Sequence, residues 1–149
     1  MQHDSLIPLA FSLNYPVSVA CPHSLISRIG SKLACNETEA VRAYGELLKF
    51  LALCASEADT LAPSKCVDEV WHEVILHTQF YATLCDRLFG GFIHHAPANG
   101  ADEASYRLTL SLLNKKFGEL DTRYWPGFSV EGAKCGTNCG SKCGSKCSD

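Results

Sequence analysis

The chain has 149 residues, of which 46% are hydrophobic and 19% charged, and its formal net charge is −3. These values are typical of one globular domain and exclude an intrinsically disordered chain. Since the sequence contains no basic cluster, it lacks the positive surface that nucleic-acid binding requires, and nucleic acid is not an expected partner.

Neither a signal peptide nor a membrane span is expected. The chain has no Lys or Arg before Arg28, and prolines interrupt its short apolar runs, which is not the pattern of a signal peptide. No run reaches the ~18 apolar residues of a membrane span, so no membrane association is expected. The sequence predicts a cytoplasmic protein whose five scattered cysteines are reduced and packed as small apolar side chains: Cys21, Cys35, Cys54, Cys66 and Cys85.

The first third of the chain predicts an arm and two helices. Residues 1–21 are expected to be irregular or extended, because Pro8 and Pro16 disfavour a helix. A short helix is expected after Pro22, with a helical spacing of Leu25, Ile26, Ile29 and Leu33. Asn36 and Glu39 have the spacing of a capping box, which predicts the start of a longer helix. Its expected buried stripe is Val41, Tyr44, Leu48, Leu51 and Ala55, with Leu47 beside it.

The middle of the chain predicts further helices. Ser64 is a plausible N-cap for a helix from residue 65 to about 77, and a second helical segment runs from Thr78 to a stop at Gly90. The pattern fits either one continuous helix or two. Residues 92–95 are expected to be extended or irregular, and residues 96–100 form a loop. Asp102 can cap a last helix, whose expected buried stripe is Tyr106, Leu110, Leu113 and Phe117.

The C-terminal part divides into an aromatic cluster and a tail. Four residues are expected to close over the core: Tyr124, Trp125, Pro126 and Phe128. After Glu131 the sequence contains nothing large and apolar to bury. We therefore predict an all-α fold, a small single-domain bundle of four to five helices over residues 1–130, with an irregular N-terminal arm and a flexible Cys-rich tail over residues 131–149.

Two stretches resemble a known family. They are VDEVWHEVILHTQFYATLCDRLFGGFIHH at residues 67–95 and FGELDTRYWP at residues 117–126. Together they are similar to the glycine-rich domain-containing protein-like family, over about residues 36–126. The resemblance rests on Val67, Asp68, Trp71, His72, Tyr81, His94, His95, Trp125 and Pro126. It implies a helical domain, often followed by a Gly- or Cys-rich tail, and it brings no established activity.

A metal site is one interpretation of the histidines in the first of these stretches. On a helix Asp68 and His72 are at positions i and i+4, so they share a face. A carboxylate there can accept one imidazole N–H and leave the other nitrogen free to bind a metal. His94 and His95 follow the Gly-Gly turn and can fold back toward this face. Asp68, His72 and one of these two histidines would suit zinc or iron.

Two other interpretations of the same residues are open. The Asp68 and His72 pair can hold a helix to a neighbouring loop, with Trp71 and Tyr81 as a packing and hydrogen-bonding motif. It can also perform proton chemistry. A zinc metalloprotease is excluded, because His72 and His77 are five residues apart and the protease motif needs four.

The tail has a regular spacing of thiols. Cys135, Cys139, Cys143 and Cys147 recur at every fourth residue among Gly, Ser and Lys. A flexible chain with four thiolates can wrap around one soft ion such as Cu(I) or Zn(II). A two-disulfide redox cluster, a modification or attachment site, and a tail with no defined site are the alternatives.

The sequence thus favours a non-enzymatic metal-binding protein, a carrier or sensor, that uses the tail and a possible second site at Asp68, His72, His94 and His95. An enzyme that uses the His72 region on a small substrate is the first alternative. The second is an interaction module, in which a protein partner binds near Trp71 and Trp125 and the tail is a tether.

Overall fold

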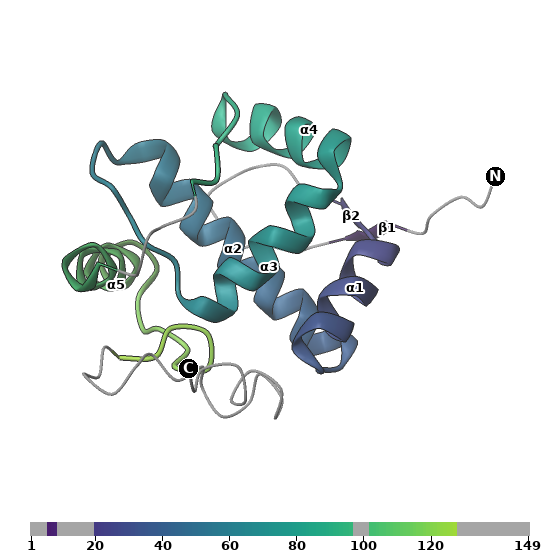
Figure 1. The fold of residues 1–149 in the computed structure, drawn as a ribbon, viewed down its shortest axis with the longest axis horizontal. Helices are drawn as coiled ribbons and strands as arrows, with labels where there is room; N and C mark the ends of the chain where they lie inside the picture. Colours follow the sequence, from purple (N-terminus) through teal and green to yellow (C-terminus); the bar gives the residue numbers. More distant parts are fainter. Residues whose placement is uncertain (1–5, 9–19, 97–101, 128–149) are drawn as a thin grey trace.

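The computed structural model describes residues 6–8, 20–96 and 102–127 (Figure 1). Phe128, the Cys-rich tail and most of the expected loop at residues 96–100 lie outside these described residues. Two short strands, β1 (Leu6–Pro8) and β2 (Ala20–Pro22), pair antiparallel within the region predicted to be extended. These described residues form five helices, α1 (His23–Leu33), α2 (Glu37–Ser56), α3 (Lys65–Leu76), α4 (Thr78–Phe89) and α5 (Glu103–Phe117). The predicted all-α fold is confirmed.

Helix α1 buries its predicted apolar residues, and none of Leu25, Ile26, Ile29 and Leu33 is more than 1% exposed. The helix ends at Ala34, which adopts a left-handed conformation and donates its N–H to the Gly30 carbonyl. This left-handed residue is the C-terminal signal common to many helices.

Helix α2 is the centre of the bundle and packs against each of the other four helices. In Figure 1 it crosses the middle of the molecule, with α1 to its right, α4 above it and α5 seen end-on at the left. The predicted capping box is confirmed, since Asn36 Oδ1 accepts from the Glu39 N–H at 2.9 Å and the Glu39 carboxylate accepts from the Asn36 N–H at 3.3 Å. Although α2 has 20 residues, no helix of the described residues is long and apolar enough to cross a membrane.

The buried surface of α2 is wider than the predicted stripe. Ala55 is exposed and Val41 only half-buried, whereas Ala43, Phe50 and Leu53 are buried. The predicted buried stripe of α2 was wrong in placing Ala55 in the core and in leaving out these other residues. Helices contact α2 from several sides, whereas a single amphipathic face describes a helix covered on one side.

Helices α3 and α4 are separate. Ser64 caps α3, its hydroxyl accepting from the Val67 N–H at 3.1 Å. At His77 the backbone has φ −89° and ψ 68°, which ends α3, and α4 begins at the next residue. Helix α4 ends at Gly90, whose φ of +73° reverses the chain.

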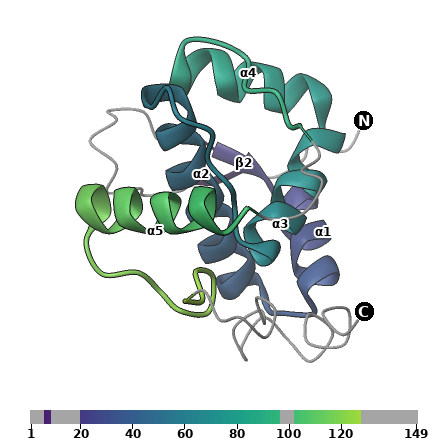
Figure 2. The ribbon, with the colours of Figure 1, turned by 60° about the vertical axis from the view of Figure 1, so that its left-hand side comes forward.

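Helix α5 and the segment after it close one side of the core. Asp102 caps α5, with Oδ1 accepting from the Ala104 N–H at 3.2 Å. The following residues 118–127, here called the Trp125 segment, fold back below α5 in Figure 2. Tyr124 and Trp125 are 4% and 2% exposed, in agreement with their predicted place over the core.

Candidate metal centre

Helix α3 places Asp68 and His72 on one face. Its opposite face is buried in the core through Cys66, Val67, Val70, Trp71 and Val74. Because the buried face fixes the rotation of the helix, the i and i+4 pair is directed away from the core. The Asp68 side chain is 33% exposed and the His72 side chain 51% exposed, so the pair lies at the surface.

The third member of the site is His95, in the segment of residues 91–96 that follows α4. This part of the chain, here called the His95 segment, has no regular secondary structure. The His95 ring packs edge-on against the Trp71 ring, with centroids 4.4 Å apart. Its side chain is only 14% exposed, so the imidazole is held between the surface of α3 and the core.

Asp68, His72 and His95 bring three donor atoms together. His95 Nε2 lies 2.7 Å from Asp68 Oδ1 and 3.1 Å from His72 Nε2, and His72 Nε2 lies 3.4 Å from Asp68 Oδ2. One oxygen or nitrogen of each residue lies within 4.8 Å of the other two. Metal ligands at the usual ~2.0–2.1 Å from a tetrahedral zinc ion are separated by ~3.3 Å, so the observed distances are close to those that zinc needs.

The same contacts can form without a metal. Since two imidazole nitrogens and a carboxylate are in mutual contact, the N–H of at least one ring must be donated within the cluster. A metal ion would replace such a shared proton and bind all three lone pairs at once. The arrangement therefore permits either a hydrogen-bonded cluster or a metal centre with two nitrogens and one oxygen.

The remaining sequence-predicted residues are elsewhere. His94 is exposed, and its ring lies against Phe92 with centroids 4.8 Å apart, so it is not among the converging donors. His77 is at the break between α3 and α4, where Nδ1 is 3.3 Å from the Glu73 carbonyl oxygen. The four tail cysteines lie outside the described residues.

Two aromatic residues support the site. Trp71 Nε1 donates to the Tyr81 hydroxyl at 3.0 Å, the hydrogen-bonding motif that was one interpretation of the sequence. The Tyr81 hydroxyl in turn donates to the Ile93 carbonyl at 2.6 Å, within the His95 segment. Burial raises the pKa of the Tyr81 phenol well above its usual range, so this hydroxyl keeps its proton. The bond to Ile93 was missed because the acceptor is a backbone atom, which no side-chain pattern indicates.

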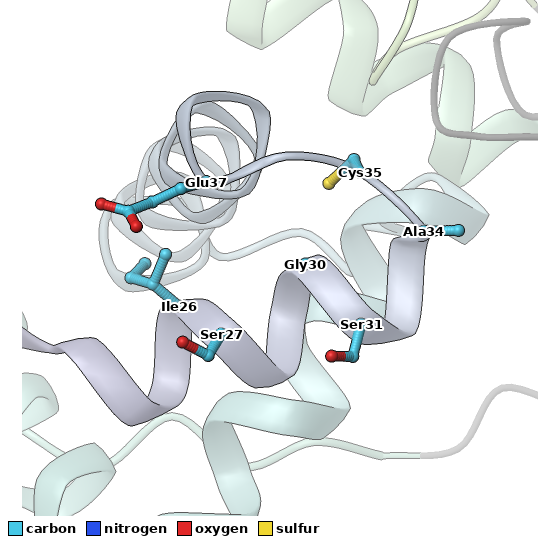
Figure 3. A pocket seen from close by; sticks show the side chains of 7 residues that line it. All are labelled: Ile26, Ser27, Gly30, Ser31, Ala34, Cys35 and Glu37. Atoms are coloured by element: carbon cyan, nitrogen blue, oxygen red, sulfur yellow. The ribbon is translucent and has the colours of Figure 1, made fainter.

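A second group of polar residues lies at a pocket between α1 and the start of α2. Figure 3 shows this pocket of about 350 Å³, with Ser27 and Glu37 in its lining. His23 lies between them, with Nδ1 3.4 Å from Ser27 Oγ and Nε2 3.3 Å from Glu37 Oε2. These are the residue types of an acyl-transfer triad. This group was not predicted from the sequence, although the i and i+4 spacing of His23 and Ser27 indicates that they share a helix face.

Three properties of this group make it a poorer candidate than the Asp68 cluster. The His23 and Glu37 side chains are 46% and 63% exposed, so water competes for both contacts. Both contacts are also longer than the ~2.6–3.2 Å expected between a nucleophile, its base and the residue that orients it. A surface ion pair of this kind contributes little to a fixed geometry.

Comparisons with known proteins identify the family. No curated protein and no solved structure matched the chain. The predicted glycine-rich domain-containing protein-like family was wrong, because the family model that matches is UCP032817-like, an uncharacterised family, over residues 16–108. Four of the nine residues that carried the resemblance, Val67, Trp71, Tyr81 and Trp125, are buried core residues, which indicate a helical fold more than one family. As the match covers more than half of the sequence, the chain belongs to the UCP032817-like family.

Proposed function

We propose that this protein binds a divalent metal ion through Asp68, His72 and His95 and acts as a metal carrier or sensor. The observation that supports the proposal is the approach of one carboxylate oxygen and two imidazole nitrogens, from helix α3 and the His95 segment, to within 4.8 Å of one another. Ligands that come from distant parts of a chain and meet at one point are typical of metal sites.

The donor set favours Zn(II) or Fe(II). Both ions accept imidazole and carboxylate ligands, whereas Mg(II) and Ca(II) prefer oxygen alone. One carboxylate and two neutral imidazoles leave a net charge of +1 on a divalent centre. The exposure of His72 and Asp68 allows a hydrated ion to enter and leave directly, which suits a carrier or a sensor better than a permanently buried structural ion.

The tail belongs to the same proposal as a second site. Cys135, Cys139, Cys143 and Cys147 are predicted to wrap around Zn(II) or Cu(I). The two sites would then differ in chemistry, since the tail offers only sulfur and the helical domain offers nitrogen and oxygen. We also propose the cytoplasm as the compartment, where the five scattered cysteines would persist as reduced thiols.

The experiment uses the full chain with the four tail cysteines changed to serine, here called the tail-Ser protein. Only the helical domain can then bind the ion. Zn(II) and Fe(II) are added in turn, the excess is removed by gel filtration, and the retained metal is measured by elemental analysis. We expect one equivalent in the tail-Ser protein and none after His72→Ala or His95→Ala.

The matched control is His94→Ala, which removes a neighbouring exposed histidine that is not among the converging donors. This variant is expected to keep its metal. The proposal fails if the tail-Ser protein retains neither ion, or if His94→Ala loses the ion as fully as His95→Ala does. Comparison of the tail-Ser protein with the unmodified chain gives the separate contribution of the tail.

The number of ligands favours an enzyme as the second candidate function. Structural zinc sites usually have four protein ligands, whereas three ligands leave a position for water or substrate. Two histidines and one carboxylate with open positions are also the donor set of non-haem Fe(II) enzymes. Turnover of a small ester or phosphoester by the metal-loaded tail-Ser protein, lost in His95→Ala and kept in His94→Ala, would favour this candidate over a carrier.

A protein partner is the third candidate. Trp71 and Trp125 are themselves buried, so a partner would instead contact large hydrophobic side chains at the surface. Phe92 is 51% exposed and lies in the His95 segment, and Leu76 at the end of α3 is 64% exposed. Leu76→Ser, at a residue outside the His95 segment, would weaken such binding and leave the metal content unchanged.

A further inference from the structure

The hydroxyl of Tyr81 joins the buried side of the Asp68, His72 and His95 cluster to the segment that carries His95. It accepts a hydrogen bond from Trp71 Nε1 at 3.0 Å and donates one to the Ile93 carbonyl at 2.6 Å. The phenol is only 1% exposed, so water does not compete for these bonds. A hydroxyl with one donor and one acceptor in fixed places has a single orientation, and this orientation fixes the position of the Ile93 carbonyl.

Ile93 precedes His95 by two residues. The segment that contains both is not itself part of a helix or strand, so backbone hydrogen bonds of that kind do not fix its position. The other contacts of the segment are aromatic. The Phe92 ring lies edge-on to Tyr81 at 5.2 Å, and the His95 ring lies edge-on to Trp71 at 4.4 Å. The segment is therefore held at three points along the chain. Tyr81 contacts the Phe92 ring and the Ile93 carbonyl, and Trp71 contacts the His95 ring.

We propose that Tyr81 is a positioning residue for the metal centre, and that its hydroxyl keeps His95 Nε2 at ligand distance from Asp68 and His72 before an ion binds. This inference rests on the proposed function. Without the hydroxyl, the His95 segment must be ordered at the moment of binding, and the entropy cost of ordering it weakens the affinity. Partners that orient metal ligands from outside the coordination sphere typically change affinity by about 10–100-fold.

The test compares two tyrosines in the tail-Ser protein. Tyr81→Phe removes the hydroxyl and keeps the buried ring. Tyr106→Phe is the matched control, because Tyr106 is also buried and its hydroxyl also donates to a backbone carbonyl, that of Pro126 at 2.7 Å, away from the proposed ligands. Zn(II) affinity is measured by competition with a chromophoric chelator. We expect a loss of about 10–100-fold for Tyr81→Phe and no change for Tyr106→Phe.

A double-mutant cycle separates positioning from general loss of structure. If Tyr81 acts through His95, then Tyr81→Phe has no further effect on the weaker, residual Zn(II) affinity that chelator competition measures in His95→Ala. The visible absorption of bound Co(II) is the second readout, because it reports the geometry of the ligands and is expected to change in Tyr81→Phe and not in Tyr106→Phe. Should Tyr81→Phe fail to fold, Phe92→Ala loosens the same phenol from a half-exposed position and is expected to weaken binding in the same direction.

The outcomes are distinct. No Zn(II) binding by the tail-Ser protein overturns the proposed function and this inference with it. Binding by the tail-Ser protein with unchanged affinity in Tyr81→Phe overturns the positioning role alone. Equal losses in Tyr81→Phe and Tyr106→Phe, or an undiminished loss in the His95→Ala background, overturn it as well, because the effect would then be one of overall stability.

Discussion

The His95 segment and the Trp125 segment are held to the helices by the same kinds of bond. In each, a tyrosine hydroxyl donates to a backbone carbonyl, Tyr81 to Ile93 at 2.6 Å and Tyr106 to Pro126 at 2.7 Å. Beside each segment a tryptophan indole N–H is also bonded: Trp71 of α3 donates to Tyr81 of α4, and Trp125, within the second segment, donates to Glu46 of α2. Both segments lack regular secondary structure, so side chains rather than a backbone ladder fix their positions.

The two segments differ in what they bury. Trp125 and Tyr124 are 2% and 4% exposed, so the Trp125 segment adds large apolar side chains to the core. Phe92 is 51% exposed and His94 is also exposed, and the His95 segment buries mainly an imidazole beside Asp68 and His72. Similar bonds thus serve stability in one segment and the geometry of a site in the other.

The largest expected effect is that of Trp125→Ala. This substitution removes a buried indole that packs on Phe50 at 6.1 Å and donates to Glu46 at 2.7 Å. We expect the free energy of unfolding to fall by about 3–5 kcal/mol, as for other buried aromatic residues. Urea unfolding followed by circular dichroism measures this change.

Zn(II) affinity of the folded fraction of Trp125→Ala is expected to stay at the level of the tail-Ser protein. A loss of affinity as large as the loss of stability would break the distinction between the two segments.

His95→Ala is expected to have the opposite effect to Trp125→Ala, with a large loss of Zn(II) affinity and little loss of stability. The substitution removes a direct ligand, so Zn(II) affinity falls by more than about 100-fold, which exceeds the effect of an outer partner. The apo protein loses only a partly exposed ring that packs on Trp71, and its unfolding free energy changes little. Chelator competition and urea unfolding of the same sample give both quantities. A large loss of apo stability would mean that His95 serves the core as Trp125 does.

Alanine substitution of the glycine at or just before the start of each segment, Gly118 or Gly90, is expected to lower stability by a smaller amount that differs between the two. Gly118 has φ +85° and ψ −150°, a region open to glycine almost alone, so Gly118→Ala is expected to cost about 1–3 kcal/mol. Gly90 has φ +73° and ψ 7°, which other residues adopt at a cost of about 1 kcal/mol. A Cβ added at either position meets nothing within 4 Å, so the cost is conformational.

In urea unfolding, Gly118→Ala is expected to be less stable than Gly90→Ala. Zn(II) affinity is expected to be reduced only in Gly90→Ala. The reverse ranking would show that contacts of the segments, rather than backbone conformation, determine the loss.

The smallest expected effect is a change in acid stability. Arg123 lowers the pKa of Asp121 through hydrogen bonds, including one of 2.6 Å, within the Trp125 segment. A carboxyl whose pKa is lower in the folded state stabilises the fold above its unfolded pKa of ~3.9, and this contribution disappears as the pH falls through the folded value. Asp121→Asn should therefore reduce the slope of stability against pH by less than about one proton.

Urea unfolding between about pH 3 and pH 6, without metal, measures this slope. An unchanged slope would contradict the assigned role of the Arg123 contact. Zn(II) should behave differently, because protons compete with the ion for imidazole and release it while the fold persists.

Local signals in the sequence predicted much of the fold. Asn36, Ser64 and Asp102 cap helices where their spacing to later residues indicated, because a cap depends only on neighbours in the chain. The break at His77 was not decided by the pattern, because the apolar period continues across it. The direction of α4 depends on its packing against α2 and α3, which periodicity does not contain.

Only the part of the candidate site that depends on local helix geometry was predictable from the sequence. Asp68 and His72 share a helix face, so their proximity follows from helix geometry. The choice between His94 and His95 was not predictable, because in an irregular segment neighbouring side chains take directions that tertiary contacts decide. Here the bond from Tyr81 to Ile93 and the packing on Trp71 select His95.

Helix α4 and the left-handed turn at Gly90 lie between His72 and His95 in the chain. His95 follows His72 by 23 residues and Asp68 by 27. A chain still being synthesised therefore presents only a carboxylate and one imidazole, a pair with weak affinity for a metal ion, until α4 has formed and the chain has turned back. In the proposed function an ion is therefore acquired only after the chain has been synthesised past His95 and α4 has formed, so occupancy of the site reports that this part of the fold is complete.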